Sequence, residues 1–247
     1  MNDVLLSNTV ISSAQAEYDA LRFLSPETPC PYLPDKKARN EAYSVDQLDG
    51  EVYQRLLTRG FRRSGRVIYR PRCRGCAECR QIRVPVESFR SSPSMRRVLR
   101  RNADVKVEEG RPSPDQEKFA IYCRYLEVQH DDSMARSYES FCEFLYDSPM
   151  ETREFQYRLH GRLIGASIAD RLPQGLSSVY MYFDPEFGGR SLGSFSLLWE
   201  IDYCRRAGLG YYYLGFYVAG SRKMSYKARI RPNEILVGDN RWVTLRV

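Results

Sequence analysis

Histidine is almost absent from this chain of 247 residues, which contains only His130 and His160. Imidazole is the side chain that most often acts as a general base near neutral pH, so a histidine-dependent catalytic centre is not expected. His160 lies in a turn before a glycine and His130 at the end of an expected helix, and both positions indicate solvated surface. The catalytic groups must therefore come from other residue types.

Long apolar runs and export signals are missing as well. No segment approaches the roughly 18 apolar residues that a membrane-spanning helix requires. The N-terminal stretch MNDVLLSNTVISS lacks the basic region and the apolar core of a secretory signal. We therefore expect a cytoplasmic protein with no membrane partner. In that compartment its seven cysteines, an odd number, are more typical of metal ligands or reactive thiols than of disulfides.

Positive charge and tyrosine are what the chain has in excess. The formal net charge is +7 and there are 18 tyrosines, whereas 43% hydrophobic and 28% charged residues are ordinary for a globular protein. A basic surface favours phosphate-bearing partners, although the same charge also fits a protein that is simply basic.

The first half of the chain is rich in loops and basic residues. A helix is expected over residues 44–60, with Ser44 as its N-terminal cap. Short strands and then a brief basic helix follow it. The composition changes near residues 103–114, so we predict a small, loop-rich basic α+β domain over residues 1–105 and a second domain over residues 106–247.

The second half begins with two expected helices, capped by Ser113 and Ser137. The hydrophobic period then becomes alternating over three strand-like runs that are separated by glycine-containing turns. The loop EFGGRSLGS leads into a helix that ends at Gly208, and YYYLGFYV follows as a strand. This order is that of an α+β acyltransferase of the N-acetyltransferase (GNAT) type, in which a mixed sheet carries helices on both faces.

The loop before the last helix is the expected donor site of such a fold, because its backbone N–H groups can bind a phosphate-bearing acyl donor. The usual loop pattern is Gln/Arg-x-x-Gly-x-Gly/Ala. Here Arg190 and Gly193 keep the Arg and the first Gly, Ser194 follows them, and Phe195 replaces the final small residue. We expect the first three to bind the donor, and we expect the bulk of Phe195 to disfavour coenzyme A.

Seven motifs together resemble the arginyl-tRNA–protein transferase family in its short bacterial form, over about residues 13–245. They are CPYLP (30–34), RSGRVIYRPRC (63–73), CRQIRV (79–84), YFDP (182–185), RSLGSFSLLWEI (190–201), YYYLGFYV (211–218) and KMSYKARIRPNE (223–234). The resemblance implies transfer of leucine from leucyl-tRNA to the α-amino group of proteins that begin with Asp or Glu. It also implies a role in the N-end rule pathway of protein degradation, with no DNA partner.

Aminolysis of an aminoacyl ester needs positioning, a neutral amine and stabilisation of the oxyanion rather than covalent help. Asp184 lies where the third strand of the meander ends, and it is the preferred polar catalytic candidate; a turn residue before Pro185 is the alternative interpretation. Tyr182 would point to the same face of that strand. Tyr226 supplies a further candidate hydroxyl.

The acidic side chain of the acceptor requires a cation. The candidates for it are Arg72, Lys223, Lys227 and Arg70. Phosphate contacts with the tRNA are expected from other arginines, without reading of its sequence. These are Arg96, Arg97, Arg100, Arg101, Arg62 and Arg63.

Cys73, Cys76 and Cys79 follow one another at intervals of three residues, and Cys30 is the other cysteine of the first half. Four thiols form the ligand set of a structural zinc or iron–sulfur site. Unmetallated thiols that line the acceptor site are the alternative interpretation. The chemistry itself requires no cofactor.

Three rival functions remain open at this point. Arginine as the donor amino acid would require a buried carboxylate to bind it. A coenzyme A-dependent N-acetyltransferase would share the fold. A non-catalytic, zinc-containing RNA-binding module would explain the cysteines and the charge, but not the full strand–loop–helix–strand unit.

Overall fold

The computed structural model describes residues 22–129, 136–238 and 240–246. Its largest element is a mixed eight-stranded sheet with the order β14-β13-β7-β12-β11-β10-β9-β8. The bounds of its strands are β7 (Arg80–Pro85), β8 (Val105–Gly110), β9 (Thr152–Leu159), β10 (Arg162–Leu172), β11 (Gly175–Phe183), β12 (Tyr211–Tyr217), β13 (Glu234–Leu236) and β14 (Trp242–Thr244).

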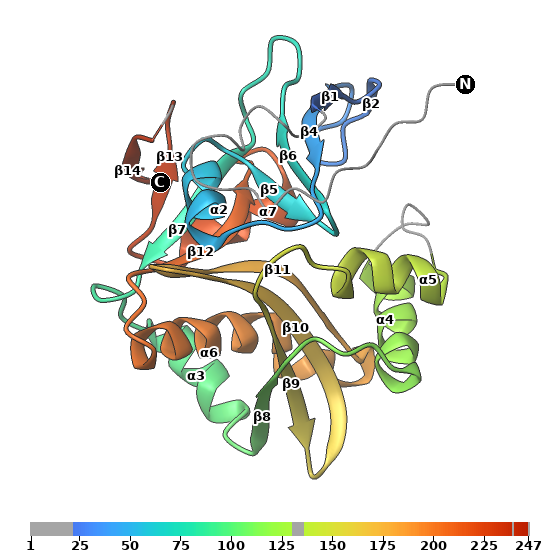
Figure 1. Ribbon diagram of the computed structural model, residues 1–247. Helices are drawn as coiled ribbons and strands as arrows, with labels where there is room; N and C mark the ends of the chain where they lie inside the picture. Colours follow the sequence, from blue (N-terminus) through green and yellow to red (C-terminus); the bar gives the residue numbers. More distant parts are fainter. Residues whose placement is uncertain (1–21, 130–135, 239, 247) are drawn as a thin grey trace.

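A smaller antiparallel sheet lies above the large one in Figure 1, in the order β1-β4-β6-β5. Its strands are β1 (Arg22–Leu24), β4 (Asn40–Ser44), β5 (Arg62–Ser64) and β6 (Val67–Pro71). A separate pair next to it consists of β2 (Thr28–Pro29) and β3 (Lys37–Ala38).

Helices cover both faces of the large sheet, so the expected mixed α+β architecture is confirmed (Figure 1). One core joins the sheet to α3 and α6, and another joins its opposite face to α4 and α5. The bounds of the helices are α2 (Gly50–Leu57), α3 (Pro93–Arg101), α4 (Gln116–Gln129), α5 (Tyr138–Phe141), η1 (Cys142–Tyr146), η2 (Pro185–Arg190), α6 (Leu192–Arg206), α7 (Arg222–Ser225) and η3 (Tyr226–Arg229).

The helix expected over residues 44–60 is shorter than its pattern indicates. Ser44 is the last residue of β4, and α2 begins only at Gly50. The cap is Asp49, whose carboxylate accepts hydrogen bonds from the backbone N–H groups of Glu51 and Val52. Two satisfied N–H groups favour a start at this point over one at Ser44.

The large sheet contains strands from both sides of the domain boundary that was expected after residue 105. β7 pairs with β12 on one edge and with β13 on the other. α3 likewise packs against α6. The strand and the helix just before the expected boundary therefore belong to the architecture of the second half.

β11 and β12 are the one parallel pair in the described part of the large sheet, and they pair only briefly. Residues 175–177 align with residues 211–213, after which a bulge interrupts β12 between Tyr213 and Gly215. Both strands continue beyond that point without pairing to each other. The backbone groups between their diverging ends are therefore open to other partners.

A buried carboxyl group connects α6 to the sheet. Glu200 is 1% exposed and accepts hydrogen bonds from the hydroxyls of Ser167 on β10 and Tyr212 on β12, each at 2.7 Å. Burial raises the pKa of Glu200 to about 7, even though these hydrogen bonds favour the charged form. Ionisation of Glu200 therefore lowers the stability of the folded protein.

We expect the Glu200→Gln variant to gain stability relative to the unaltered protein as pH rises. The carboxyl ionises in the unfolded chain near pH 4.5, but in the folded protein only near pH 7, so its stabilising effect is lost between these values. The gain should be on the order of 3 kcal/mol between pH 4 and pH 8, at about 1.4 kcal/mol per pKa unit. Urea unfolding across this range measures it, with the exposed Glu139→Gln as control; a pH-independent difference would contradict it.

Candidate active site

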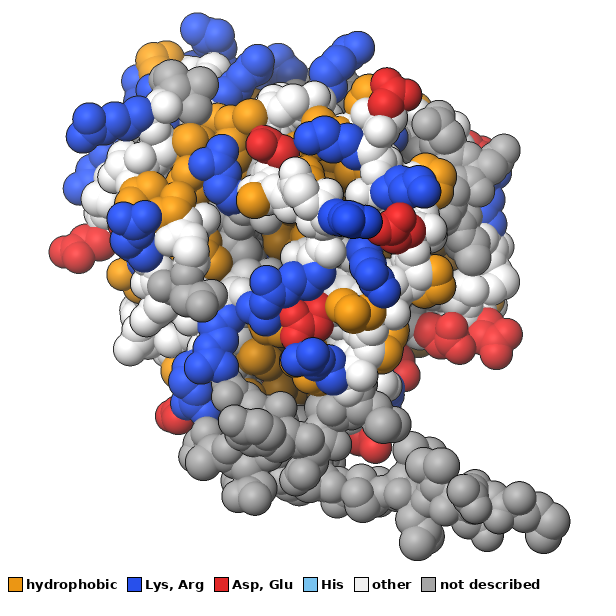
Figure 2. Space-filling model, turned by 90° about the horizontal axis from the view of Figure 1, so that it is seen from above, with side chains coloured by type: hydrophobic (Ala, Val, Ile, Leu, Met, Phe, Trp, Pro, Cys, Tyr) orange, Lys and Arg blue, Asp and Glu red, His pale blue; other side chains and the backbone are white. Residues whose placement is uncertain are grey.

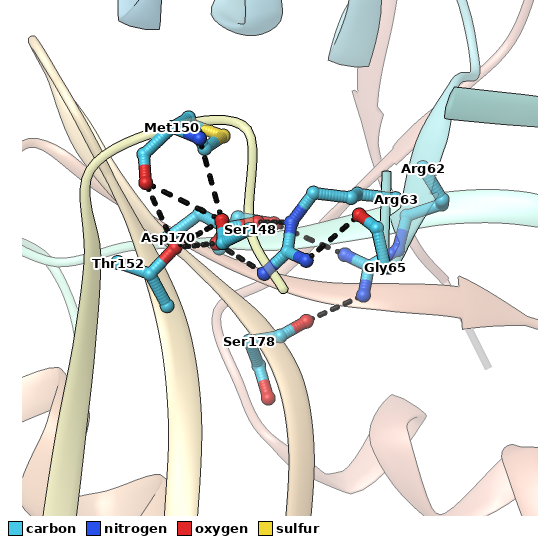
Figure 3. Close-up of polar contacts among 9 residues, drawn as sticks. Arg62, Arg63, Gly65, Ser148, Met150, Thr152, Asp170 and Ser178 are labelled. Atoms are coloured by element: carbon cyan, nitrogen blue, oxygen red, sulfur yellow. Dashed lines mark hydrogen bonds and ion pairs between the residues drawn. The ribbon is translucent and has the colours of Figure 1, made fainter. Parts of the chain in front are cut away.

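Arg62 reaches from the smaller sheet to the point where β11 and β12 diverge (Figure 3). Its Nη1 donates to Ser177 Oγ at 3.2 Å, and its Nη2 donates to the backbone oxygen of Ser178. A Cβ atom on Gly215 would lie 3.2 Å from the guanidinium carbon, and Gly215 has a φ of +85°. Glycine is therefore required there both for the backbone conformation and for the close approach of Arg62.

Arg63 is bound inside the protein on the opposite side of the strand. Its Nε and Nη2 donate to the two oxygens of Asp170 at 2.8 and 2.6 Å, and Nη1 donates to the backbone oxygen of Gly65 (Figure 3). Arg62 and Arg63 are 7% and 3% exposed. Neither is placed to contact tRNA phosphates, which corrects that expectation: the alternation of the strand directs both side chains into packed interfaces.

Lys227 lies beside Arg62. Its Nζ donates to the backbone oxygen of Phe216 at 2.7 Å and approaches the sulfur of Met224 at 3.3 Å. Burial and the charge of Arg62 lower the pKa of Lys227 to about 7. Lys227, a candidate cation for the acidic side chain of the acceptor, is thus only 7% exposed, at the diverging end of β12.

Residues of the N-terminal half cover this position. The rings of Tyr69 and Phe216 are 6.2 Å apart, and a Cβ atom on Gly220 would lie 3.0 Å from Leu33 of the CPYLP motif. Burial raises the pKa of Tyr32, and the nearby Arg62 opposes that rise. The CPYLP segment, β5 and β6 therefore meet the ends of β11 and β12 at one place.

The four cysteines of the first half gather near the same place. Burial, and then the neighbouring thiols of Cys73 and Cys30, raise the pKa of Cys79 to about 12. Cys73 Sγ accepts from the backbone N–H of Arg39 at 3.5 Å. Within the described ranges, no group of three or more His, Cys, Asp or Glu side chains is arranged to hold a metal ion.

Arg70 and Arg72 share an internal carboxylate. Glu41 Oε2 accepts from their Nε atoms at 2.8 and 2.9 Å, and these bonds outweigh burial to hold the pKa of Glu41 at about 2. Arg70 also stacks over the ring of Phe61 at 4.4 Å, which commits it to the interior. Arg72 keeps 52% of its side chain exposed. Only Arg72 of this pair remains open to a ligand.

Tyr182 does not face a substrate. It is fully buried, and its hydroxyl lies 2.9 Å from that of Tyr146. Sequence alternation correctly places it on one face of β11, but α4 and α5 cover that face. The expected catalytic role of Tyr182 is therefore wrong. Tyr226, in contrast, is 48% exposed.

Asp184 is engaged by its neighbours. Its Oδ2 accepts from Arg124 at 2.8 Å and from Arg162 at 3.1 Å, and its Oδ1 accepts from the backbone N–H of Glu186. Burial opposes ionisation, but the hydrogen bond from Arg124 lowers the pKa of Asp184 below its ordinary value. The carboxylate is thus ionised, 3% exposed and fixed at the start of η2, which fits the turn-residue interpretation.

The expected donor loop has an open surface. Gly193 and Ser194 are exposed at the start of α6, while Arg190 pairs with Asp104 at 2.8 Å. Phe195 points into the core and its ring lies 5.9 Å from that of Tyr157. The expectation that Phe195 obstructs the loop is therefore incorrect, because the first turn of the helix rotates it away from the surface.

The basic helix α3 lies next to this loop. Ser92 caps it, and its apolar residues pack on the core that contains α6. Arg101 Nη1 donates to the backbone oxygen of Gly189 in η2 at 2.6 Å. Its exposed cations are Arg96, Arg97, Arg100 and Arg101.

Basic side chains also gather on the face above the smaller sheet (Figure 2). Exposed cations of the segments that form this part include Lys36, Lys37, Arg72 and Arg74. In α7, Lys223 is exposed as well. The exposed His160 matches its expected solvated position, whereas His130 lies outside the described residues.

Sequence reasoning missed Glu41 and the burial of Lys227. Arg70 and Arg72 are two residues apart on one strand, so they share a face, and this spacing was a usable signal for a common carboxylate partner. No local pattern distinguishes Lys227 from the exposed Lys223 in the same motif. Its burial depends on contacts with β12 and Arg62, which are distant in the sequence.

Two family models match the chain. The model described as "Arginine-tRNA-protein transferase, N terminus" covers residues 28–97, and the one described as "Arginine-tRNA-protein transferase, C terminus" covers residues 117–237. Among the described residues, no helix is long and apolar enough to cross a membrane.

Curated relatives are similar over most of the chain. An aspartate/glutamate leucyltransferase of Stutzerimonas stutzeri is 42% identical over 219 residues, which is 87% of this chain and 93% of the relative. One from Hahella chejuensis is 37% identical over 90% of this chain and 96% of the relative. Among solved structures, the crystal structure of FemX aligns with a TM-score of 0.43 at 13% identity, over 72% of this chain and 63% of FemX.

Proposed function

The chain belongs to the arginine-tRNA-protein transferase family, and from this premise we propose that it transfers leucine from leucyl-tRNA to the α-amino group of proteins that begin with Asp or Glu. The observation that supports this most is the 42% identity to a curated aspartate/glutamate leucyltransferase over 87% of the chain. The product would enter the N-end rule pathway in the cytoplasm, with no membrane or DNA partner.

The reaction requires one nucleophilic attack. The neutral α-amine of the acceptor attacks the ester carbonyl carbon, the new C–N bond forms, and the bond to the ribose oxygen of the tRNA breaks. The proton that the amine loses ends on the departing ribose oxygen, directly or through water. A free α-amine has a pKa of roughly 7.7–8, so a useful fraction is already neutral at cytoplasmic pH. Positioning therefore suffices for much of the rate.

We place this chemistry between the diverging ends of β11 and β12, as in an acyltransferase of the GNAT type. The brief parallel pairing of these strands and the open loop before α6 support this finer fold assignment. Arg190, Gly193 and Ser194 would bind the 3′ end of the tRNA. Residues 1–105 would supply most tRNA and acceptor contacts and residues 106–247 the catalytic frame, although β7 and α3 contribute to that frame too.

Leucine fits better than arginine as the donor amino acid. An arginine side chain would need a free buried carboxylate, and each buried carboxylate in the described part of the chain already has partners. Four of these carboxylates accept hydrogen bonds from Arg or Lys side chains, and the fifth, Glu200, accepts them from buried hydroxyls. The four are Glu41, Glu154, Asp170 and Asp184.

The cysteines have no part in this reaction, because aminolysis of an ester needs neither a thiolate nor a metal. If a structural zinc or iron–sulfur group binds, the clustered thiols are the ligands that would hold it. The high pKa of Cys79 means that such binding would have to displace a proton. The ligands would be Cys30, Cys73, Cys76 and Cys79.

Labelled leucyl-tRNA mixed with peptides that begin with Asp, Glu, Lys or Ala tests the function directly. We expect label on the Asp and Glu peptides alone, because only they carry the acidic side chain that a cation can bind. Replacement of leucyl-tRNA by arginyl-tRNA or acetyl-coenzyme A should give no product. Absence of label on every peptide would refute the function.

The tRNA-binding role of α3 predicts a change in salt dependence. In the triple variant Arg96→Ala, Arg97→Ala and Arg100→Ala, the slope of log K against log[salt] for tRNA should become shallower by about two to three, because each phosphate contact contributes about 0.7–0.9. Filter binding at several salt concentrations measures the slope, and Arg206→Ala at the far end of α6 is the control. An unchanged slope would remove α3 from the interface.

The exposed cations Arg72 and Lys223 should contribute more to binding of the acceptor peptide than to binding of the tRNA. We expect Arg72→Ala and Lys223→Ala each to raise the KM for an Asp-initiated peptide severalfold, since an exposed charge contributes about 0.2–1 kcal/mol. Affinity for leucyl-tRNA should stay within twofold of its initial value. Equal losses for the two substrates would argue that both residues contact the tRNA instead.

A further inference from the structure

Four cations are buried in the described part of the chain: Arg62, Arg63, Lys118 and Lys227. Arg63 and Lys118 each have a carboxylate partner, at 2.6 Å from Asp170 and 2.9 Å from Glu154. No carboxylate of the described residues pairs with the other two. A guanidinium does not lose its proton in a protein, so Arg62 is a buried charge without a counter-ion.

Neutral groups surround this pair of cations. Arg62 bonds to a hydroxyl and a carbonyl, and Lys227 bonds to a carbonyl and approaches a thioether. Arg62 also acts electrostatically on ionisable groups from α2, β6, the CPYLP motif and η3. These are Tyr53, whose pKa burial raises to about 12, Tyr69 and Tyr32, whose pKa values burial also raises, and Lys227.

The hydrogen-bond partners of Arg62 and Lys227 among the described residues are all neutral, so none of them balances the charge of either cation. The field between the diverging strands favours an anion from outside.

We propose that Arg62 and Lys227 together bind the side-chain carboxylate of the acceptor's first residue. This inference rests on the proposed function, and it assigns the carboxylate to a buried pair of cations rather than to the exposed Arg72 and Lys223 alone. Both cations lie at the position where we place acyl transfer. Arg62 donates a hydrogen bond to the backbone oxygen of Ser178 on β11, and Lys227 donates one to that of Phe216 on β12.

A carboxylate fits this position better than a tRNA phosphate. Each of the two cations is only 7% exposed, so the pair offers little surface to a phosphate held in an RNA helix, and a short side chain at the end of a polypeptide is the smaller anion to accommodate. A guanidinium also offers parallel N–H groups to the two carboxylate oxygens. Asn and Gln have nearly the same shape but no charge, so a buried cationic site should reject them strongly.

Carboxylate binding should also change the protonation of Lys227. Burial and the charge of Arg62 make the ammonium form unfavourable in the free enzyme, with a pKa of about 7. A bound carboxylate offsets both effects, so Lys227 takes up a proton from solvent as the acceptor binds. Because that uptake becomes harder as pH rises above 7, the KM for acidic acceptors should increase with pH.

The test compares peptides that begin with Asp, Asn, Glu and Gln at saturating leucyl-tRNA. We expect Lys227→Met and Arg62→Gln each to raise the KM for the Asp peptide at least about tenfold, as loss of a buried charged hydrogen bond predicts, and to reduce the preference for Asp over Asn similarly. The KM for leucyl-tRNA should stay within about twofold of its initial value. Lys106→Met, an exposed lysine on β8, is the matched control.

A second measurement uses the unaltered enzyme and does not depend on the folding of any variant. The ratio of its KM for the Asp peptide to its KM for the Asn peptide, in which titration of the α-amine cancels, is measured from pH 6 to pH 8.5, and we expect this ratio to rise above pH 7 by up to about tenfold per pH unit. In Lys227→Met this rise should disappear. A flat profile in the unaltered enzyme would overturn the inference.

Failure of the inference can be distinguished from failure of the function. If the unaltered enzyme labels Asp and Asn peptides equally, the proposed function fails. If it selects Asp but Lys227→Met keeps that selectivity and raises the KM for leucyl-tRNA instead, the pair binds a tRNA phosphate and the inference is wrong. A fall in kcat alone, with both KM values unchanged, would assign the pair to the oxyanion and overturn the inference as well.

Discussion

The N-terminal half of the chain meets the large sheet at one buried contact, the insertion of Arg62 between two strands that have begun to separate. Arg62 donates to the hydroxyl of Ser177, the last residue of β11 that pairs with β12, and to the backbone oxygen of Ser178, the first residue beyond that pairing. Gly215 permits the insertion, because any side chain there would meet the guanidinium. The N-terminal half is thereby joined to the catalytic frame at the position where acyl transfer is proposed, so neither half completes the site alone.

The sequence predicted the second half well for a physical reason: its meander, loop and helix follow one another, and alternation together with turn residues specifies such local order. The pairing of β7 with β12 could not be predicted from the sequence, because two strands more than a hundred residues apart leave no local pattern that shows their pairing. Burial explains the errors in the site. Arg63 and Tyr182 belong to residue types that are usually found at surfaces or at reactive positions, and only tertiary contacts reveal that they are enclosed.

The positive charge of the chain therefore has two different physical roles. Exposed arginines on α3 lie in water, where salt screens their charge and limits the distance over which it acts. Arg62 and Lys227 are buried, where water and salt screen charge only weakly. An anion that pairs with them therefore gains more electrostatic energy than one that pairs with a cation on the surface. The excess of basic residues in the composition counts both kinds of cation and does not distinguish between them.

The position of β7 has a consequence for how the protein is made. This strand, residues 80–85, lies between β12 and β13, which end at residues 217 and 236. During synthesis from the N-terminus, β7 leaves the ribosome long before either neighbour exists, and both of its edges stay unpaired until the chain is almost finished. A chain that ends before residue 211 therefore lacks both strands that cover the edges of β7 in the complete protein.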